Sequence, residues 1–486
     1  MKKKLLIGLI ATVLLMAVAI FIFFFKKADN NILFKIPGQS KSVLIIDVPA
    51  IAKKLFIDEF SKKNNSTRQL AKAIPDSLAA INWNQSGLNL FDKMVLFSLE
   101  DSGSISLHFI IKINDLKKYN LFIDKLGNDF KFKTETQNKI KFAYWKSLGI
   151  LIAWNNEYVS GTRTSENTIK SKNILEKILS TRKEQSIMTN KVFAQKLVKT
   201  HDVMFYSNSY KQNPYKQLNV LNSSLENFVL YIDFNQGKTE INIETFAKKG
   251  SPINNLFAKK NNDLNLIKNS DTTALNLYLN VNAEVFSQIF NQYSGIQFKE
   301  KDIPLIKAWN GELNLVLDGI KTIENEYISY DFDDNFNKIE IKKKKKDKVL
   351  NLKAVASYDQ NRFDSIFKFN KPDKDGKDTL LYKGSNYLLK RGNNSFLIYN
   401  KLLRKPVLEK KNPNCNISLE ADCQKLIKII EEFGIKTDTK WFKNIPISNI
   451  DLNLSNKEEI KLKVNFYFID KNKNSLFSLV EYFGKK

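Results

Sequence analysis

Histidine, cysteine and arginine are scarce in this chain, and each shortage limits the chemistry that the protein can carry out. Among 486 residues there are two histidines and two cysteines, and only 6 of the 77 basic residues are arginines. A histidine-dependent hydrolase, or a zinc site built on histidine and cysteine, needs such residues in recognisable groups. The P-loop, the dinucleotide-binding glycine motif, the nucleophile elbow and the HExxH zinc motif are all missing from the sequence. We therefore predict a non-enzymatic protein with no catalytic residues, no cofactor and no metal site.

A hydrolase that uses carboxylates alone stays open as an alternative. Two neighbouring carboxyl groups can act as the acid and the base of a hydrolytic reaction. The candidate acids are Asp47, Asp233 and the small cluster of Asp331, Asp333 and Asp334. A polar strand face or a turn is the simpler explanation of that cluster.

The few histidines and cysteines have structural explanations. His108 and His201 lie in apolar surroundings, and we predict them as core or sheet-edge residues. Cys415 and Cys423, with seven residues between them, either close a small disulfide loop ahead of a helix or remain separate thiols.

Glycine and proline are also few, 17 and 10 residues, which excludes a collagen-like or linker-dominated architecture. The formal net charge is +26, and it comes almost wholly from lysine. Arginine is the residue that reads bases and clamps phosphates with two hydrogen bonds, so its scarcity argues against nucleic acid. We predict no nucleic-acid partner, while a weaker attraction to anionic lipid or envelope polymer stays open.

One long hydrophobic run stands at the N-terminus. It extends from Leu5 to Phe25 without a charge, between Lys2–Lys4 and Lys26–Lys27. At about 1.5 Å per helical residue it is roughly 30 Å long, the thickness of a bilayer core. We predict a signal-anchor, a transmembrane helix within residues 1–27, in a single-pass protein of the inner (cytoplasmic) membrane. The lysines place residues 28–486 in the periplasm, and a long cleaved signal peptide is the alternative.

The rest of the chain shows signs of an internal repeat. Residues 43–56 and 275–290 both contain a strand-like run, then Asp47 or Asn280 as the expected helix cap, then Val-x-Ala and apolar residues at helical spacing. Trp83-Asn84 with Gly87 is likewise matched by Trp309-Asn310-Gly311. Four such correspondences occur in the same order, offset by roughly 220–230 residues, so we predict tandem domains at 28–258 and 265–486.

Alternating apolar residues predict strands in each half, at 94–99, 105–113, 140–145 and 148–154 in the first. An amphipathic helix is expected after the second strand, with its apolar positions at Leu116, Tyr119, Phe122, Ile123 and Leu126. Hairpin turns are expected at 155–156, 235–238 and 392–394. We predict an α+β fold in which each repeat is a large antiparallel sheet with helices packed on one face.

Two charged segments have a functional and a structural explanation. Lys342–Lys346 could touch anionic headgroups, but a solvated hairpin connection or a lysine-guarded edge strand explains it without a partner. Residues 373–378 resemble a calcium loop superficially. The turn glycine is misplaced, however, and position twelve is Gly384 rather than glutamate, so an Asp-Gly turn is expected.

The start of the predicted exported domain carries a family resemblance. Ile36-Pro37 followed by Val43 and Ile46-Asp47, soon after an export segment, resembles uncharacterised membrane-anchored envelope proteins of Bacteroidota-type bacteria. The resemblance covers roughly residues 32–60 and their repeat at 268–293. It implies an envelope location and no known activity, and the chain lacks the lipobox cysteine of the lipidated members.

These observations favour a non-enzymatic, membrane-anchored envelope protein that binds or scaffolds a protein, lipid or glycan of the envelope. The alternative is a transport factor that holds lipid or other apolar cargo between a helix and a sheet.

Overall fold

A computed structural model describes most of the chain after residue 29. The described residues are 30–61, 85–89, 92–101, 103–164, 168–208, 225–248, 251–257, 264–294, 307–332, 336, 338–362, 379–381, 387–391, 395–400, 402–410, 413–432, 445–456 and 459–484. They fold into two compact units that interleave along the sequence. The first contains Met1–Ser209, Asn227–Thr239 and Asn472–Lys486, and the second contains Tyr210–Glu226 and Glu240–Lys471.

The first unit is built on an antiparallel sheet. In spatial order its strands are β4 (Thr134–Gln137), β5 (Ile140–Trp145), β6 (Ile150–Trp154), β7 (Tyr158–Arg163), β3 (Ser104–Lys112), β2 (Lys93–Asp101), β1 (Ser42–Asp47), β8 (Val203–Ser207) and β9 (Leu225–Asn235). Its helices are η1 (Asn31–Lys35), α2 (Val48–Ser61), α5 (Leu116–Phe130), α6 (Thr168–Ser180), η3 (Lys183–Gln185), η4 (Ile187–Thr189), α7 (Lys191–Lys196) and α15 (Ser475–Gly484).

Both faces of this sheet are covered, which corrects the prediction of helices on one face. On β6, Leu151 and Ala153 join the core under η1, α6 and α7, whereas Ile152 and Trp154 join the core under α5. Successive side chains of a strand point to opposite faces. Because β6 is apolar at every position, both of its faces need a cover.

The second unit is also an antiparallel sheet. In spatial order its strands are β10 (Lys238–Ala247), β21 (Ile460–Phe468), β20 (Ile447–Asn456), β19 (Ile417–Asp422), β12 (Leu275–Asn280), β13 (Trp309–Phe332), β14 (Lys338–Tyr358), β17 (Ser395–Asn400), β16 (Tyr387–Arg391) and β15 (Thr379–Leu381). A two-stranded sheet pairs β11 (Leu266–Ile267) with β18 (Leu408–Glu409). The helices are α9 (Pro252–Leu256), α10 (Ala283–Ser294) and α13 (Cys423–Glu432).

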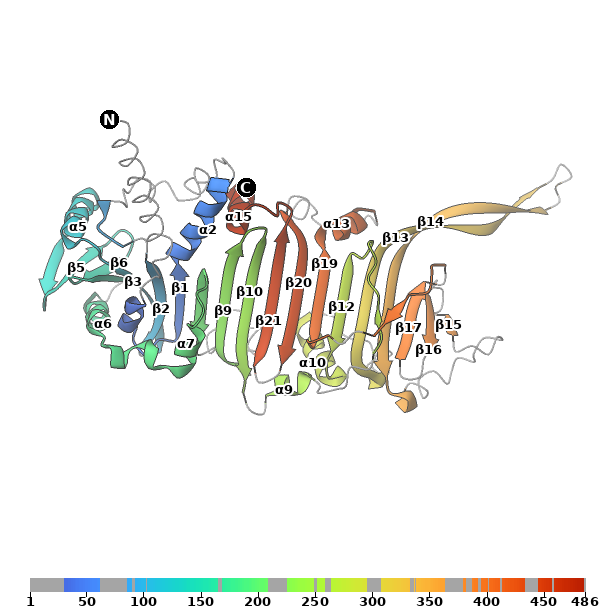
Figure 1. Ribbon diagram of the computed structural model, residues 1–486, viewed down its shortest axis with the longest axis horizontal. Coiled ribbons are helices and arrows are strands. Elements are labelled where there is room, and N and C mark those ends of the chain that lie inside the picture. Colours follow the sequence, from blue (N-terminus) through green and yellow to red (C-terminus); the bar gives the residue numbers. More distant parts are fainter. Residues whose placement is uncertain are drawn as a thin grey trace, which may run out of the picture. The chain divides into compact units, whose positions relative to one another are not determined.

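The two sheets share one strand order, visible in Figure 1. In the first unit the order β6-β7-β3-β2-β1-β8-β9 surrounds the first strand of the unit, β1. In the second unit β16-β17-β14-β13-β12-β19-β20 surrounds β12 in the same way. Each central strand is followed by a helix, α2 or α10. The two units therefore repeat one topology.

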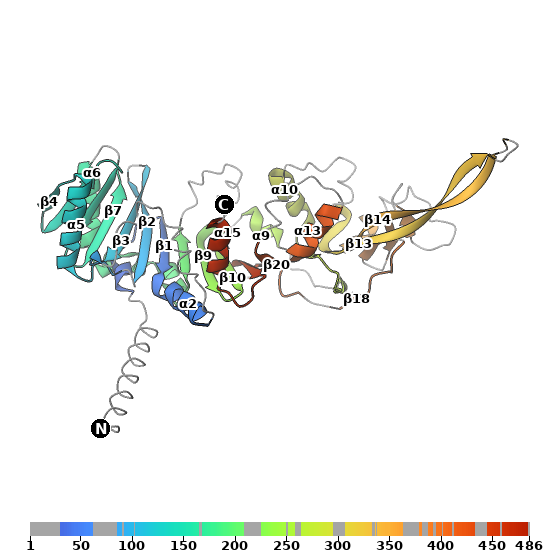
Figure 2. The same cartoon turned by 90° about the horizontal axis from the view of Figure 1, so that it is seen from above.

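The β13–β14 hairpin is much longer than its counterpart and extends away from the other strands of its unit (Figures 1 and 2). Its strands pair with each other from Ile320↔Leu350 to Phe332↔Lys338, beyond the part of the hairpin that pairs with β12 and β17. The lysine run Lys342–Lys346 lies inside this ribbon, opposite residues 324–328. It is therefore not a hairpin connection. Among the described strands this part of β14 pairs with β13 alone, so the run lies on an edge strand, as the second alternative predicted.

The predicted membrane helix requires a correction. Within the described ranges no helix is long and apolar enough to cross a membrane. The longest helix there, α5, has 15 residues, or about 22 Å at 1.5 Å per residue, short of a bilayer core. The segment Leu5 to Phe25, on which the prediction was placed, lies outside the described residues. We therefore withdraw the transmembrane helix from the fold class, together with the single-pass inner-membrane placement and the periplasmic location of residues 28–486 that rested on it.

Local predictions in the first unit are largely confirmed. Strands β2, β3, β5 and β6 and helix α5 lie where alternation and helical spacing predicted them. The Asp47 carboxylate accepts a hydrogen bond from Ala50 N at 3.0 Å and caps α2 as expected. The matching prediction for Asn280 is wrong. Asn282 caps α10 instead, accepting hydrogen bonds from Glu284 N and Val285 N at 3.1 and 3.2 Å, because two residues separate the end of β12 at Asn280 from the first helical residue, Ala283.

Candidate functional site

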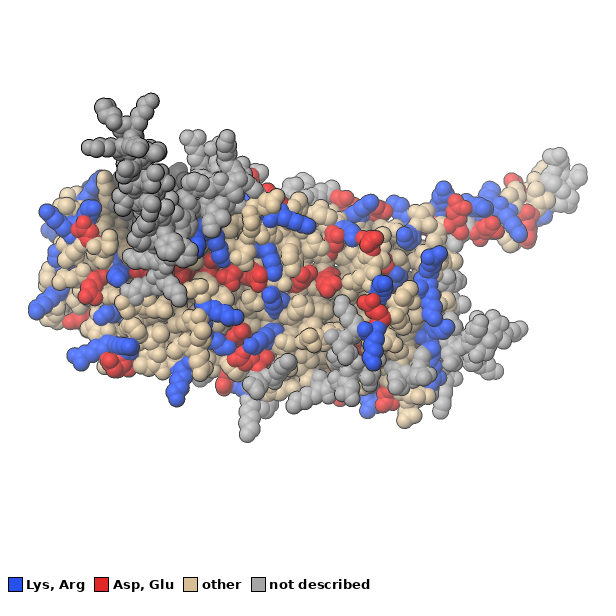
Figure 3. All heavy atoms as spheres, in the orientation of Figure 1, with Lys and Arg blue, Asp and Glu red and all other residues tan. Residues whose placement is uncertain are grey.

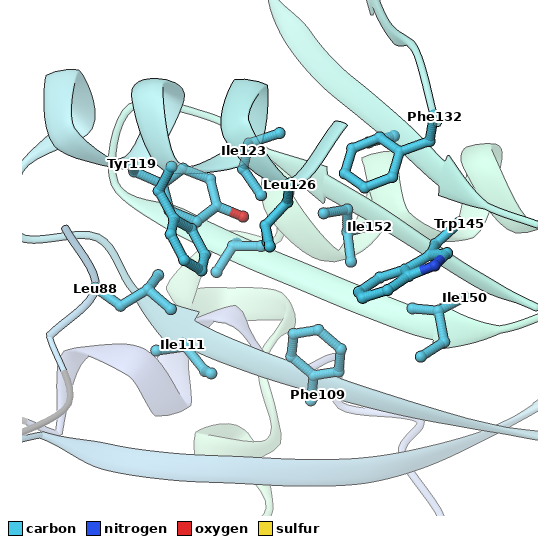
Figure 4. A pocket seen from close by; sticks show the side chains of 13 residues that line it. Leu88, Phe109, Ile111, Tyr119, Ile123, Leu126, Phe132, Trp145, Ile150 and Ile152 are labelled. Carbon is cyan, nitrogen blue, oxygen red and sulfur yellow. The ribbon is translucent and has the colours of Figure 1, made fainter. Parts of the chain in front are cut away.

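The described residues form a partly open apolar cavity between α5 and the sheet of the first unit (Figure 4). Helix α5 begins where the Asp115 carboxylate accepts a hydrogen bond from Lys118 N at 3.0 Å. It ends at Lys131, in the left-handed conformation with φ 57°, whose N–H bonds back to Gly127 O. Residues at helical spacing put one apolar face of α5 over the sheet. The cavity is lined by Leu88, Phe109, Ile111, Tyr119, Phe122, Ile123, Leu126, Phe132, Ala143, Trp145, Ile150, Ile152 and Val159.

The floor of the cavity comes from alternate residues of β3, β6 and β7. Phe109 and Ile111 project from β3, and Ile150 and Ile152 project from β6. The Phe109 ring occupies the space above Gly161 of β7, where a Cβ atom would lie 2.4 Å from its Cε1. The missing side chain of Gly161 therefore lets this ring lie flat in the floor.

The size and polarity of the cavity set what it can hold. Its volume is about 230 Å³. Empty apolar cavities of about 150 Å³ bind benzene or xenon, and pockets for drug-sized ligands begin at about 300 Å³. Among the described residues, no lysine, arginine, histidine or carboxylate lines it. The arrangement suits a single small ring or short alkyl chain and excludes an ionised group, whose burial without a partner is costly.

One lining residue carries a hydroxyl group into this apolar site. Tyr119 is 2% exposed, and its ring packs edge-on against Trp154 with ring centroids 5.7 Å apart. In Figure 4 its oxygen is directed toward the side of the cavity formed by Ile123 and Leu126. Burial raises the pKa of the Tyr119 hydroxyl, so it stays protonated.

A second polar feature of the first unit is a cluster of charged side chains beneath α2. Lys54 Nζ lies 2.8 Å from Asp202 Oδ2 and 3.9 Å from Asp233 Oδ1, and His201 Nδ1 lies 2.7 Å from Asp233 Oδ2. Burial raises the pKa of Asp202, against the opposing effect of Lys54. For Asp233 burial acts in the same direction, but His201, the Asp202 N–H and Lys54 outweigh it and the pKa is lowered. The cluster has internal partners and ties α2 to β9, which is a structural role.

The remaining candidate acids have local explanations. Asp47 caps α2, and Asp233 belongs to the cluster with His201. Asp331 lies on the exposed β13–β14 ribbon of the second unit, while Asp333 and Asp334 are outside the described residues. The carboxylate hydrolase stays a prediction.

His108 is a core residue, as predicted. It is 1% exposed, its ring stacks on Phe97, and its Nε2 lies 2.8 Å from the Ser106 hydroxyl. His201 is half-buried at the edge formed by β8 and β9 rather than in an apolar core.

The two cysteines are separate thiols. Strand β19 lies between Cys415 and Cys423 and is extended over six residues, about 20 Å at roughly 3.3 Å per residue. A disulfide needs Cα atoms within about 7 Å. The predicted alternative of a small disulfide loop is therefore wrong.

The remaining charged features are the calcium-like segment and the surface charges. Residues 373–378, which resembled a calcium loop, lie outside the described residues. Figure 3 shows lysine and arginine side chains over much of one face, with acidic side chains also present on it.

Sequence reasoning found the apolar positions of α5, β3 and β6 but missed the cavity among them. The same spacing would result from a fully packed core. A glycine at position 161 beneath an aromatic ring was the one available signal, and it becomes meaningful only when strand register places Phe109 opposite Gly161.

Comparison with known proteins leaves the family open. No protein-family model and no curated protein matches this sequence. Among solved structures, crystal forms I, III and IV of TP0453 are similar to this chain at 13%, 11% and 10% sequence identity. They cover 45%, 47% and 46% of this chain and 80%, 82% and 82% of TP0453, with TM-scores of 0.26, 0.28 and 0.27. Likeness at this level supports no conclusion about function. It also provides no support for the resemblance to Bacteroidota-type envelope proteins.

Proposed function

We propose that this protein is a non-enzymatic binding protein that holds a small apolar molecule, or the apolar end of a larger one, between α5 and the sheet of its first unit. The observation that carries the proposal is the cavity of about 230 Å³ with an almost wholly apolar lining. Of the functions considered, binding of apolar cargo is the one that a buried apolar space favours.

The size of the cavity sets the expected affinity. At about 30 Å³ per water-sized group, it has room for roughly seven methylene-sized groups. Burying each group contributes about 0.8 kcal/mol to binding. Seven such groups contribute about 6 kcal/mol in total, before the cost of ordering the ligand is subtracted. This corresponds to a dissociation constant no tighter than about 10⁻⁵ M for a ligand held by the cavity alone.

The proposal is tested by titrating the protein with toluene in a calorimeter. We expect saturable binding with a dissociation constant between about 10⁻⁵ and 10⁻³ M. Ala143→Leu fills part of the cavity, and we expect it to abolish binding while leaving the melting temperature unchanged or higher.

Leu121→Phe is the control, because Leu121 is 62% exposed on the outer side of the same helix. It should bind toluene as the parent protein does. If Ala143→Leu fails to fold, Ile152→Phe serves the same purpose from the floor of the cavity. Unchanged binding in a folded variant with a filled cavity, or no binding to the parent protein, would overturn the proposal.

A further inference from the structure

The cavity contains one polar group that a ligand can reach. Tyr119 is 2% exposed and lines the cavity, and its hydroxyl forms no hydrogen bond with any described residue. Trp145 Nε1 also lacks a partner among the described residues, but it has no accessible surface. A ligand atom in the cavity therefore meets the Tyr119 oxygen and not the indole nitrogen.

A buried hydroxyl without a partner has a definite chemical preference. Leaving such a donor unsatisfied is unfavourable, and a ligand that offers an acceptor removes that penalty. Since burial keeps the phenol protonated, it presents an O–H donor at neutral pH. The other lining side chains are apolar apart from Trp145, so the hydroxyl has no competitor for the acceptor.

The charge of the ligand is limited by the same surroundings. An ionised carboxylate would leave water for a space without a lysine, arginine or histidine to pair with it. A neutral oxygen, as in an alcohol, ester or ketone, loses much less hydration free energy when it enters the cavity. It then accepts a hydrogen bond from the Tyr119 hydroxyl.

We propose that the cavity selects neutral molecules that combine an apolar ring or chain with one hydrogen-bond acceptor. This inference rests on the binding function proposed above. Tyr119 is the specificity-determining residue, and its hydroxyl donates to that acceptor. An ionised carboxylate is excluded from the cavity itself, which is why benzoate, whose carboxylate is attached directly to the ring, should not bind.

Three probes that share one ring test this selection: toluene, benzyl alcohol and benzoate at pH 7. In calorimetric titrations of the parent protein we expect toluene and benzyl alcohol to bind and benzoate to show no binding. In Tyr119→Phe we expect the affinity for benzyl alcohol to fall about fivefold, the effect of one neutral hydrogen bond. Toluene affinity should change less than twofold.

Tyr144→Phe is the matched control, because Tyr144 follows Ala143 on β5 and packs against the core on the opposite face of the sheet. It should leave both affinities unchanged. If Tyr119→Phe lowers the affinities for toluene and benzyl alcohol equally, the inference is overturned but the proposed binding function is not. The same holds if benzoate binds to the parent protein as tightly as benzyl alcohol does. No toluene binding to the parent protein would instead remove the proposed function.

Discussion

Gly87 lies directly against the backbone of Tyr119: a Cβ atom on Gly87 would come within 2.6 Å of Tyr119 N and 2.4 Å of Asp115 O. Gly87 O also accepts hydrogen bonds from Asn114 N and Asp115 N at 2.9 and 3.0 Å. The loop before β2 thereby fixes the first turn of α5, the helix that carries Tyr119, the one hydroxyl among the described lining residues.

Gly87→Ala should therefore destabilise the first unit and weaken ligand binding. Gly87 has φ +71°, where an L-residue is strained, and the added methyl group would also collide with backbone atoms that cannot move independently. We expect a loss of about 3 kcal/mol in unfolding free energy, together with weaker binding of toluene.

Gly103→Ala is the control for backbone strain. Gly103 has φ +80°, but a Cβ there meets nothing within 4 Å. Its cost should be about 1 kcal/mol, with binding unchanged. If chemical denaturation shows that the two substitutions lower the unfolding free energy equally, the contact between Gly87 and α5 does not contribute to stability.

The stability of the first unit should depend on pH through His108. Burial lowers its pKa from an ordinary value of 6.5 to about 4. The stabilisation from keeping this ring neutral is present above pH 6.5 and is lost as pH falls from 6.5 to about 4, because only the unfolded chain binds a proton in that range. The loss amounts to about 3 kcal/mol. Melting temperatures of His108→Gln over the same range should fall less than those of the parent protein, and parallel curves would contradict the assignment.

A buried ion pair should be essential to the second unit. Lys353 pairs with Asp318, whose side chain is 2% exposed and also accepts from Thr273 Oγ1 at 2.6 Å. Lys353→Met leaves a buried carboxylate without its cation and should lower the unfolding free energy by about 3–5 kcal/mol. Lys348→Met removes the exposed pair with Glu432, at 3.4 Å, and should cost less than about 1 kcal/mol. Comparable losses in denaturation experiments would show that burial does not distinguish the two pairs.

Both cysteines should react as thiols. Protein unfolded without reductant and treated with iodoacetamide should gain two carbamidomethyl groups by mass spectrometry, since β19 holds the cysteines apart. In the folded protein Cys423 should react more slowly than an unperturbed thiol, because burial first, and then Asp422, raise its pKa. Recovery of an unmodified, oxidised pair would contradict the register of β19.

Much of the first unit was predictable because its signals are local. The alternation in β2, β3, β5 and β6 and the spacing of Leu116, Tyr119 and Ile123 each depend on a few consecutive residues. The cap at Asp47 is local as well. Asn280 misled the same reasoning, because β12 ends there but α10 begins only at Ala283, so the cap position falls on Asn282.

The sequence by itself determined the antiparallel strands, the first-unit helix over the sheet and the absence of familiar catalytic motifs. Each follows from residue type and short-range spacing. Only the tertiary structure decided that helices cover both faces of the first sheet, that β19 separates the cysteines, and that the apolar residues under α5 leave a space with Tyr119 beside it. These depend on register and on how completely side chains from distant segments fill a shared volume, which no local pattern encodes.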